Sequence, residues 1–183
     1  MVDIVVIDAD PEWPVQFREI ANYLVPIIGS SIVRIEHVGS TAVSGLAAKP
    51  IIDIDVVVAE EDDVPVVLGL IESAGYRWIG DLDVEGREAF EPTSAPTFAA
   101  HHLYLVVEDN RAHSDQWLLR DALSDSPDLI ERYGHLKRQN VLLSNGDADR
   151  YTALKAAFVA DVLAEARRSR GMVPVEYWKP DLE

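Results

Sequence analysis

The sequence contains no cysteine, and basic residues are scarce relative to acidic ones. Without cysteine the chain can form neither a disulfide nor a cysteine-ligated zinc site. Its 16 Lys and Arg residues face 32 Asp and Glu residues, so the formal net charge is −16. Such a charge opposes binding to the phosphates of DNA or RNA, and we expect no bulk nucleic acid partner. A small nucleotide that enters a cleft with Mg²⁺ is compatible with this charge, because the metal and nearby cations dominate the local potential.

Long hydrophobic runs are also missing from the sequence. No apolar stretch approaches the roughly 20 residues that a membrane helix needs, and residues 1–4 carry no basic segment. We therefore expect a cytoplasmic protein without a membrane partner. A chain of 183 residues with 48% hydrophobic content can bury one substantial core. We expect one domain over residues 1–170, with a sheet-bearing half to about 110, a helical half over 111–170, and an irregular tail over 171–183.

Apolar periodicity predicts an α+β fold with a mixed sheet, because a β-rich half precedes a helical half. Strands are expected at 3–7, 32–35, 51–58, 76–79, 87–90 and 99–107, with a hairpin or loop over 80–96 around the fifth. Helices are expected at 12–28, from 62 or 63 to 75, and across 112–168, with a helix start at Ser126-Pro127 and a turn at Asn145-Gly146. Pro26 is expected to end or kink the first helix near Val25.

The most informative segment joins a turn of small residues to a strand that carries two aspartates. Gly39, Ser40 and Thr41 follow an apolar strand, and such a turn offers backbone N–H groups to phosphate oxygens. Twelve residues separate Ser40 from Asp53, and Asp53 and Asp55 interrupt a β-branched strand and must point to the same face of it. Two close carboxylates suit a hard cation such as Mg²⁺, with Mn²⁺ as the alternative. The competing interpretation is an edge strand whose polar side chains face water.

The same segment resembles the signature of a known family. The matching run is Glu36-His37-Val38-Gly39-Ser40-Thr41-Ala42-Val43-x-Gly45-Leu46-x-Ala48-Lys49-Pro50-Ile51-Ile52-Asp53, which is similar to the GrpB family, also called UPF0157. Segments elsewhere are also similar to GrpB members, namely Asp10-Pro11-x-Trp13-Pro14, His101-His102-Leu103-Tyr104, Leu119-Arg120-Asp121-x-Leu123, Tyr133-x-x-Leu136-Lys137 and Tyr151-x-x-x-Lys155. The resemblance therefore spans nearly the whole chain.

GrpB proteins are placed in the nucleotidyltransferase superfamily. Its pattern is a hydrophobic residue, Gly, then Gly or Ser, followed about ten residues later by Asp, a hydrophobic residue and Asp or Glu. Val38-Gly39-Ser40 and Asp53-Ile54-Asp55 satisfy it. The resemblance implies a nucleotidyltransferase-like mixed sheet with flanking helices and a helical C-terminal half.

The strand expected at 99–107 is a second place for chemistry. His102 and Tyr104 share one face of it, while His101 lies on the other. Active nucleotidyltransferases often carry a third carboxylate in this region, but residues 99–107 contain none. His102 is therefore a candidate general base or metal ligand, and the alternative is a satisfied polar pair with Tyr104.

Several cationic and aromatic residues are further candidates for the site. Lys49 lies inside the motif loop and is assigned to phosphate binding, and the remaining substrate-site candidates are His37, Arg87, Tyr104, Arg120, Tyr151 and Lys155. Arg120 has a structural alternative as an ion pair of Asp121, on a helix face that also carries Trp117. Lys155 could be a solvated side chain, and His37 could serve only to orient the loop. His101, His113 and His135 are expected to be structural or on the surface.

Three functions follow from these residues. In the first, an enzyme transfers a nucleotidyl group from an NTP to a small-molecule acceptor, with Mg²⁺ on Asp53 and Asp55, phosphates at Ser40, and His102 as the base. In the second, a non-catalytic module binds a nucleotide or a CoA precursor, since GrpB domains occur fused to dephospho-CoA kinase, which implies a link to CoA metabolism. In the third, the same carboxylates support metal-dependent hydrolysis of a phosphate ester.

Overall fold

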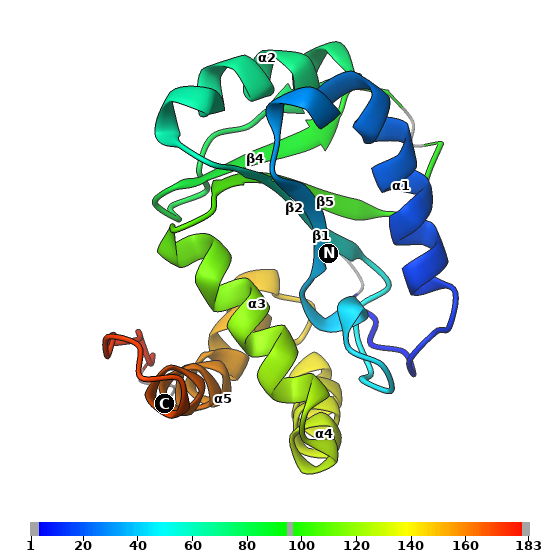
Figure 1. Cartoon of the computed structure of the whole chain (residues 1–183). Coiled ribbons are helices and arrows are strands. Elements are labelled where there is room, and N and C mark those ends of the chain that lie inside the picture. The colour runs from blue at the N-terminus through cyan, green and yellow to red at the C-terminus, as the bar shows by residue number, and fades with distance from the viewer. Residues whose placement is uncertain (1–3, 95–96, 181–183) are drawn as a thin grey trace.

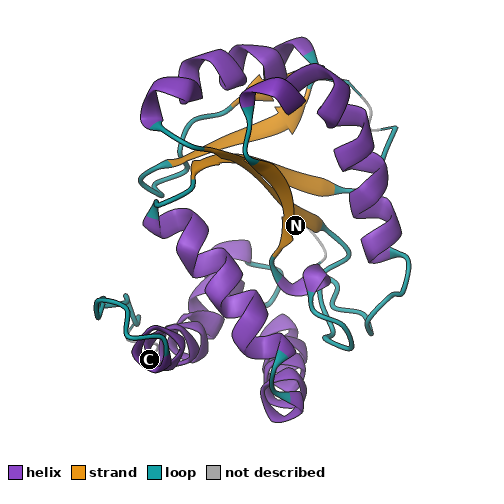
Figure 2. Cartoon of the chain, viewed as in Figure 1, coloured by secondary structure: helices purple, strands orange, loops and turns teal. Residues whose placement is uncertain are grey.

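The computed structural model describes residues 4–94 and 97–180. A mixed five-stranded sheet lies between two layers of helices (Figure 1), and Figure 2 shows the strands enclosed by helices above and below. The strands are β1 (Arg34–Val38), β2 (Ile52–Val58), β3 (Tyr76–Trp78), β4 (Arg87–Pro92) and β5 (His101–Val107). Their spatial order is β1-β2-β5-β4-β3. Only β2 and β5 pair in parallel among these strands. β5 is the central strand of this order, and β2 is the interior strand beside it.

One face of the sheet carries the main hydrophobic core. The helices α1 (Trp13–Ile28) and α2 (Val64–Ser73) cover this face. Ile52, Ile54 and Val56 of β2 and Leu103 and Leu105 of β5 are buried beneath them. Because side chains alternate along a strand, the same pattern directs Asp53 and Asp55 to the opposite face.

Three helices approach the opposite face. They are α3 (Arg111–Ser124), α4 (Pro127–Ser144) and α5 (Ala148–Ser169). Each is preceded by an N-cap residue whose side chain accepts a backbone N–H hydrogen bond, namely Asn110, Ser126 and Asp147. Short 3₁₀ turns complete the elements at Gly29–Ser31, Ser40–Ala42 and Glu61–Asp63. Val43 and Leu46 of the motif loop pack with Leu123 and Tyr133. The helical bundle is thereby fixed against the loop that follows the Gly-Ser turn.

The α+β fold and the mixed sheet are confirmed, and one local prediction is wrong. In the strand predicted at 3–7, Asp3 lies outside the described residues and only Ile7 forms a bridge, with Ala48. The helix predicted over 12–28 agrees with α1, which passes Pro26 and continues to Ile28, with Leu24 and Ile28 buried in the core. Pro26 therefore does not end the helix, and a kink near Val25 stays a prediction. β1 also begins later than predicted and ends at Val38, so the Gly-Ser turn follows it directly.

Other boundaries agree or stay open. Residues 171–180 form neither helix nor strand, as expected, while the rest of the predicted tail and Pro96 of the predicted loop lie outside the described residues. The division into halves of one domain stays a prediction. Within the described parts of the chain, every helix is too short or too polar to cross a bilayer.

Candidate functional site

A cleft of about 430 Å³ opens between the polar face of the sheet and the helical bundle. Most of the residues proposed from the sequence contribute to its lining: Gly39, Ser40, Thr41, Lys49, Asp53, Arg87, His102, Tyr104, Tyr151 and Lys155. These residues come from β2, β4, β5, the motif loop and α5. The fold therefore gathers in one place groups that are far apart in the sequence. We call this space the sheet–helix cleft.

The Gly-Ser turn and Asp53 are built as one unit. Val38 pairs with Asp53 in the antiparallel register of β1 and β2, so the turn starts beside the aspartate. Gly39 has a φ of +69° and a ψ of −166°, a backbone conformation that is essentially restricted to glycine. A Cβ atom at this position would lie 2.9 Å from both Cβ and Cγ of Asp53. The absence of a side chain at Gly39 is what allows the carboxylate to pack against the turn.

Asp53 and His102 form a pair at the floor of the cleft. Parallel pairing of β2 with β5 places His102 beside Asp53 and Tyr104 beside Asp55. His102 Nδ1 and Asp53 Oδ1 are 2.9 Å apart, and their side chains are 47% and 28% exposed. A neutral imidazole that donates its Nδ1 hydrogen to Asp53 keeps Nε2 as its basic nitrogen. The position next to Asp53 on β5 is thus occupied by an imidazole instead of a third carboxylate.

Asp55 is more deeply buried than Asp53 and is not among the residues that line the sheet–helix cleft. Its side chain is fully buried, and Oδ2 accepts a 2.9 Å hydrogen bond from His113 Nδ1 on α3. His113 Nε2 lies 3.0 Å from Arg34 Nη2, and since arginine only donates, this nitrogen is the acceptor. Among the described residues, Asp55 Oδ1 has no hydrogen-bond partner. Burial raises the pKa of Asp55, and the His113 hydrogen bond opposes this shift.

His37 lies on the other side of the sheet and orients the motif loop. Its ring stacks on Phe17 of α1 with ring centroids 4.9 Å apart. The Thr41 hydroxyl donates to the Ile51 carbonyl at 3.2 Å, so His37 Nε2, 3.0 Å away, donates to the Thr41 oxygen. Burial lowers the pKa of His37 to about 4, which keeps the imidazole neutral. Thr41 is consequently left with its backbone, and not its hydroxyl, for any phosphate contact.

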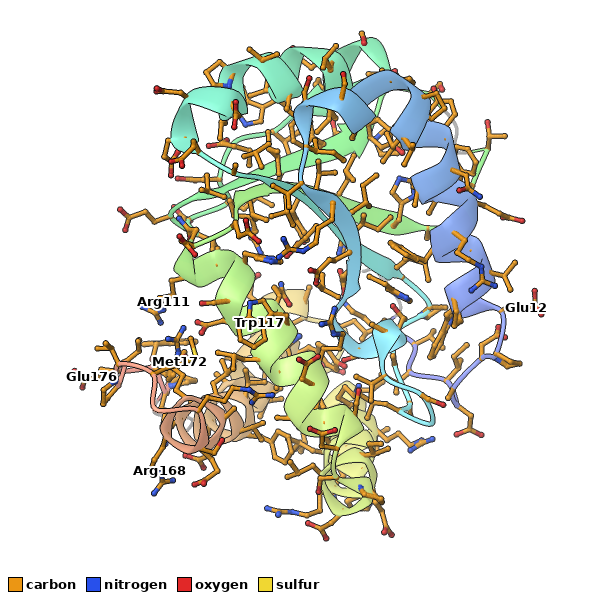
Figure 3. All side chains as sticks on the ribbon, viewed as in Figure 1. Glu12, Arg111, Trp117, Arg168, Met172 and Glu176 are labelled. Atoms are coloured by element: carbon orange, nitrogen blue, oxygen red, sulfur yellow. The ribbon has the colours of Figure 1, made fainter. Side chains whose placement is uncertain are left out.

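Arg120 is not among the residues that line the sheet–helix cleft and instead takes part in an ion-pair network. Its Nη1 donates to Glu36 Oε2 at 3.0 Å and to the His37 carbonyl at 3.1 Å, while Nε donates to Asp121 Oδ1 at 2.9 Å. The guanidinium thereby joins α3 to β1. Trp117, on the same helix, and Met172 and Tyr177 of the C-terminal segment all pack against a small buried cluster that contains Leu118 and Leu163. Figure 3 labels Trp117 and Met172.

Cations and tyrosine rings alternate along the cleft. Arg87 Cζ is 4.4 Å from the ring centroid of Tyr104, and the Nζ atoms of Lys49 and Lys155 are 5.6 and 5.4 Å from that of Tyr151. Burial raises the pKa of Tyr104 and Tyr151 to about 12, so both keep their hydroxyl hydrogens. Burial lowers the pKa of Lys155. These cations give the cleft a positive lining inside a strongly acidic protein.

Sequence reasoning did not assign four further polar lining residues: Gln116, Tyr133, Lys137 and Thr152. Lys137 is the most unusual, because it is 2% exposed and its Nζ has no hydrogen-bond partner among the described residues. Burial, followed by repulsion from Lys155, lowers its pKa to about 7. The available signal was a repeated spacing, since Tyr133 and Lys137 on α4 are four residues apart, as are Tyr151 and Lys155 on α5.

The carboxylates of Asp53 and Asp55 provide only some of the ligands that a metal ion needs. Across residues 4–94 and 97–180, there is no group of three or more His, Cys, Asp or Glu side chains arranged to hold an ion. Two carboxylates on one strand face, one with an unpartnered oxygen, still fit Mg²⁺, which is commonly bound by one or two carboxylates together with substrate phosphates. A metal at this site would therefore depend on a phosphate-bearing ligand.

Comparison with known proteins agrees with this architecture. The family model described as GrpB protein matches residues 3–165. A dephospho-CoA kinase of Mycobacterium bovis is 42% identical over an alignment 197 residues long, gaps included, and this alignment covers 95% of this chain and 48% of that protein. This chain thus spans about half the length of that relative.

Two solved structures have similar folds. The crystal structure of the conserved protein GrpB from Enterococcus faecalis has a TM-score of 0.78 and 32% identity, covering 91% of this chain and 99% of that one. Cid1 in complex with its short product ApU has a TM-score of 0.50 and 14% identity, covering 72% and 42%. The second likeness concerns the fold alone, which is nucleotidyltransferase-like.

Proposed function

This chain belongs to the GrpB family, and we propose that it is a Mg²⁺-dependent enzyme that transfers a nucleotidyl group from an NTP to a small-molecule acceptor. One observation supports this proposal above all: the Gly39-Ser40 turn, the Asp53 carboxylate and a set of cationic side chains line the same cleft. A glycine-restricted turn, a carboxylate and cations are the groups that a metal-bound triphosphate requires. We expect the acceptor to be a small molecule because of the acidic surface.

In this proposal some residues of the cleft bind the phosphates and another transfers a proton. Gly39 and Ser40 hold phosphate oxygens through the turn, and Lys49 neutralises their charge. His102, oriented by Asp53 at 2.9 Å, accepts the proton of the acceptor hydroxyl at Nε2. When bound to Asp53 and Asp55, Mg²⁺ (or Mn²⁺) supplies charge neutralisation of the triphosphate.

A second candidate is a non-catalytic module that binds a nucleotide or a CoA precursor. The position of Asp55 favours it, because this carboxylate is fully buried and already bound to His113. His102 favours it as well, because its imidazole lies on β5 beside Asp53, where active nucleotidyltransferases often carry a third carboxylate. Similarity to a dephospho-CoA kinase makes dephospho-CoA the first CoA precursor to test.

Calorimetric titration separates these candidates. Each NTP and dephospho-CoA would be titrated into the wild-type protein with Mg²⁺ and then with EDTA. The enzyme proposal expects Mg²⁺-dependent binding of an NTP, lost in Asp53→Asn and kept in Asp109→Asn, a matched change at an exposed aspartate. Binding that is indifferent to both EDTA and Asp53→Asn would overturn the metal site and support the module.

A positive titration leads to an acceptor screen. Release of pyrophosphate with a given acceptor supports nucleotidyl transfer, while release of phosphate from an ester without any acceptor indicates the hydrolase. The single variant is preferable to an Asp53→Asn, Asp55→Asn double variant. Asp55 is a partner of buried His113, so its replacement would disturb the fold as well as the site.

A further inference from the structure

The chain has only four lysines, and three of them, Lys49, Lys137 and Lys155, line the sheet–helix cleft. We call these three residues the lysine wall. The fourth, Lys179, is the only lysine that forms an ion pair within the described parts of the chain, with Asp161 at 2.6 Å. The other 12 basic residues are arginines. Three of the four lysines thus line this cleft, whereas Arg87 is the only arginine among its lining residues in the described parts of the chain.

None of the three lysines of the lysine wall forms an ion pair with any other residue that the structure describes. Lys137 is 2% exposed and its Nζ has no hydrogen-bond partner among the described residues. Its amine lies 4.4 Å from the Tyr133 ring centroid, a contact that does not replace hydration. A buried ammonium without an acceptor is costly, so this position is stable either with a neutral amine or with an anion from outside the chain.

We propose that the lysine wall binds the phosphate groups of a polyanionic ligand, and that Lys137 takes up a proton when the ligand binds. This inference rests on the proposed function, because the phosphates would be those of the nucleotide. It adds a role for Lys137 and a regulation by pH.

The surroundings of Lys137 explain why the free protein would hold it neutral near pH 7. Burial and the like charges of Lys155 and Arg138 lower its pKa to about 7, and the more distant Asp53 opposes them. The titratable and charged groups on the elements around it are Tyr133 and Arg138 on α4, Tyr151 and Lys155 on α5, Lys49 in the loop, Asp53 on β2, Arg87 on β4, and His102 and Tyr104 on β5. Cations outnumber carboxylates in this set. An incoming phosphate reverses the balance and raises the pKa of the amine.

The choice of lysine over arginine is consistent with this role. A guanidinium keeps its charge at any pH that a protein survives, and burying it without an anion would be costly. A lysine can release its proton when the cleft is empty and regain it with the ligand. The affinity for a polyphosphate should then be constant below pH 7 and fall as the pH rises above it, by at most about tenfold per pH unit for one proton.

The test uses inorganic tripolyphosphate with EDTA, because this probe has no nucleoside and needs neither a metal nor Asp53. Calorimetry at about pH 8 in buffers of different ionisation enthalpy gives the number of protons taken up, expected to approach about one more in the wild type than in Lys137→Arg. Lys137→Arg carries a permanent charge and should bind without this uptake. Lys137→Met, the smaller change, should bind more weakly at pH 6.5 and also lack the uptake. Lys179→Met is the matched control and should behave as the wild type.

Three results would overturn the inference: no binding of tripolyphosphate at any pH, binding without proton uptake, or uptake that persists in both Lys137 variants. None of these depends on Mg²⁺-dependent NTP binding through Asp53. If tripolyphosphate binds with proton uptake and no NTP requires Asp53, the lysine wall stands and the proposed enzyme fails. If NTP binding requires Asp53 while proton uptake is absent, the proposed enzyme stands and the role of the lysine wall fails.

Discussion

The imidazole of His113 donates a 2.9 Å hydrogen bond to the carboxylate of Asp55, and neither side chain has any exposed surface. This contact joins α3 of the helical bundle to β2 at the centre of the sheet. Arg34 continues it towards the sheet edge through His113 Nε2, at 3.0 Å. The network fixes one wall of the sheet–helix cleft relative to the other.

Replacement of His113 by alanine should destabilise the protein strongly. The change leaves the Asp55 carboxyl group buried without a partner, and loss of one member of a buried pair costs about 3 to 5 kcal/mol. Urea denaturation followed by circular dichroism measures the free energy of unfolding. The exposed His135 provides the control, since His135→Ala should change it by less than about 0.5 kcal/mol. Equal stability of the two variants would show that the pair does not stabilise the fold.

Replacement of Gly39 by alanine should affect both the fold and the site. A φ of +69° with a ψ of −166° costs a non-glycine residue about 1 to 3 kcal/mol, and the new methyl group would displace Asp53. We expect a lower free energy of unfolding and weaker Mg²⁺-dependent nucleotide binding. Gly69→Ala is the matched control, because Gly69 lies in α2 with no atom near its missing Cβ and the change should stabilise by about 0.5 to 1 kcal/mol. Unchanged binding in Gly39→Ala would separate the turn from the ligand site.

The centre of the site could be predicted from the sequence because it depends on local rules. Alternation along a strand places Asp53 and Asp55 on one face, and a Gly-Ser turn after a strand is recognisable from residue types alone. The competing edge-strand interpretation is wrong, since β2 lies between β1 and β5 in the interior of the sheet. The fold class followed from the order of strands and helices together with the family resemblance.

The burial of Asp55 and the roles of His113 and Lys137 could not be predicted in this way. His113 meets Asp55 only because α3 packs across the sheet, a contact between residues 58 positions apart. Lys137 is buried because α4 and the motif loop share a small core with Tyr133. Such burial is a property of packing, which periodicity within a single helix does not reveal.

Replacement of Arg120 by lysine should weaken the fold and spare the cleft. Lysine cannot reproduce the three contacts of the guanidinium with Glu36, the His37 carbonyl and Asp121. We expect a loss of about 1 to 3 kcal/mol in the free energy of unfolding. Arg132→Lys, at an exposed i,i+4 pair with Asp128, should cost less than about 0.5 kcal/mol. Nucleotide affinity that falls while stability stays constant would instead place Arg120 in the binding site.

Replacement of His37 by glutamine should change how stability depends on pH, because burial lowers the pKa of His37 from 6.5 to about 4. The unfolded chain binds a proton at this residue below pH 6.5 and the folded protein does not until about pH 4. The contribution of neutral His37 to the free energy of unfolding is therefore complete above pH 6.5 and is lost as the pH falls towards 4. The slope of this loss is up to about 1.4 kcal/mol per pH unit for one proton. Because carboxylates also titrate at acidic pH, the informative quantity is the difference between the wild type and His37→Gln, which has no ionisable group. Urea denaturation between about pH 4.5 and 7 should show a shallower loss of stability in His37→Gln than in the wild type. Identical slopes in the two proteins would mean that His37 is protonated in the folded state, and the stacked, neutral imidazole that holds Thr41 would have to be abandoned.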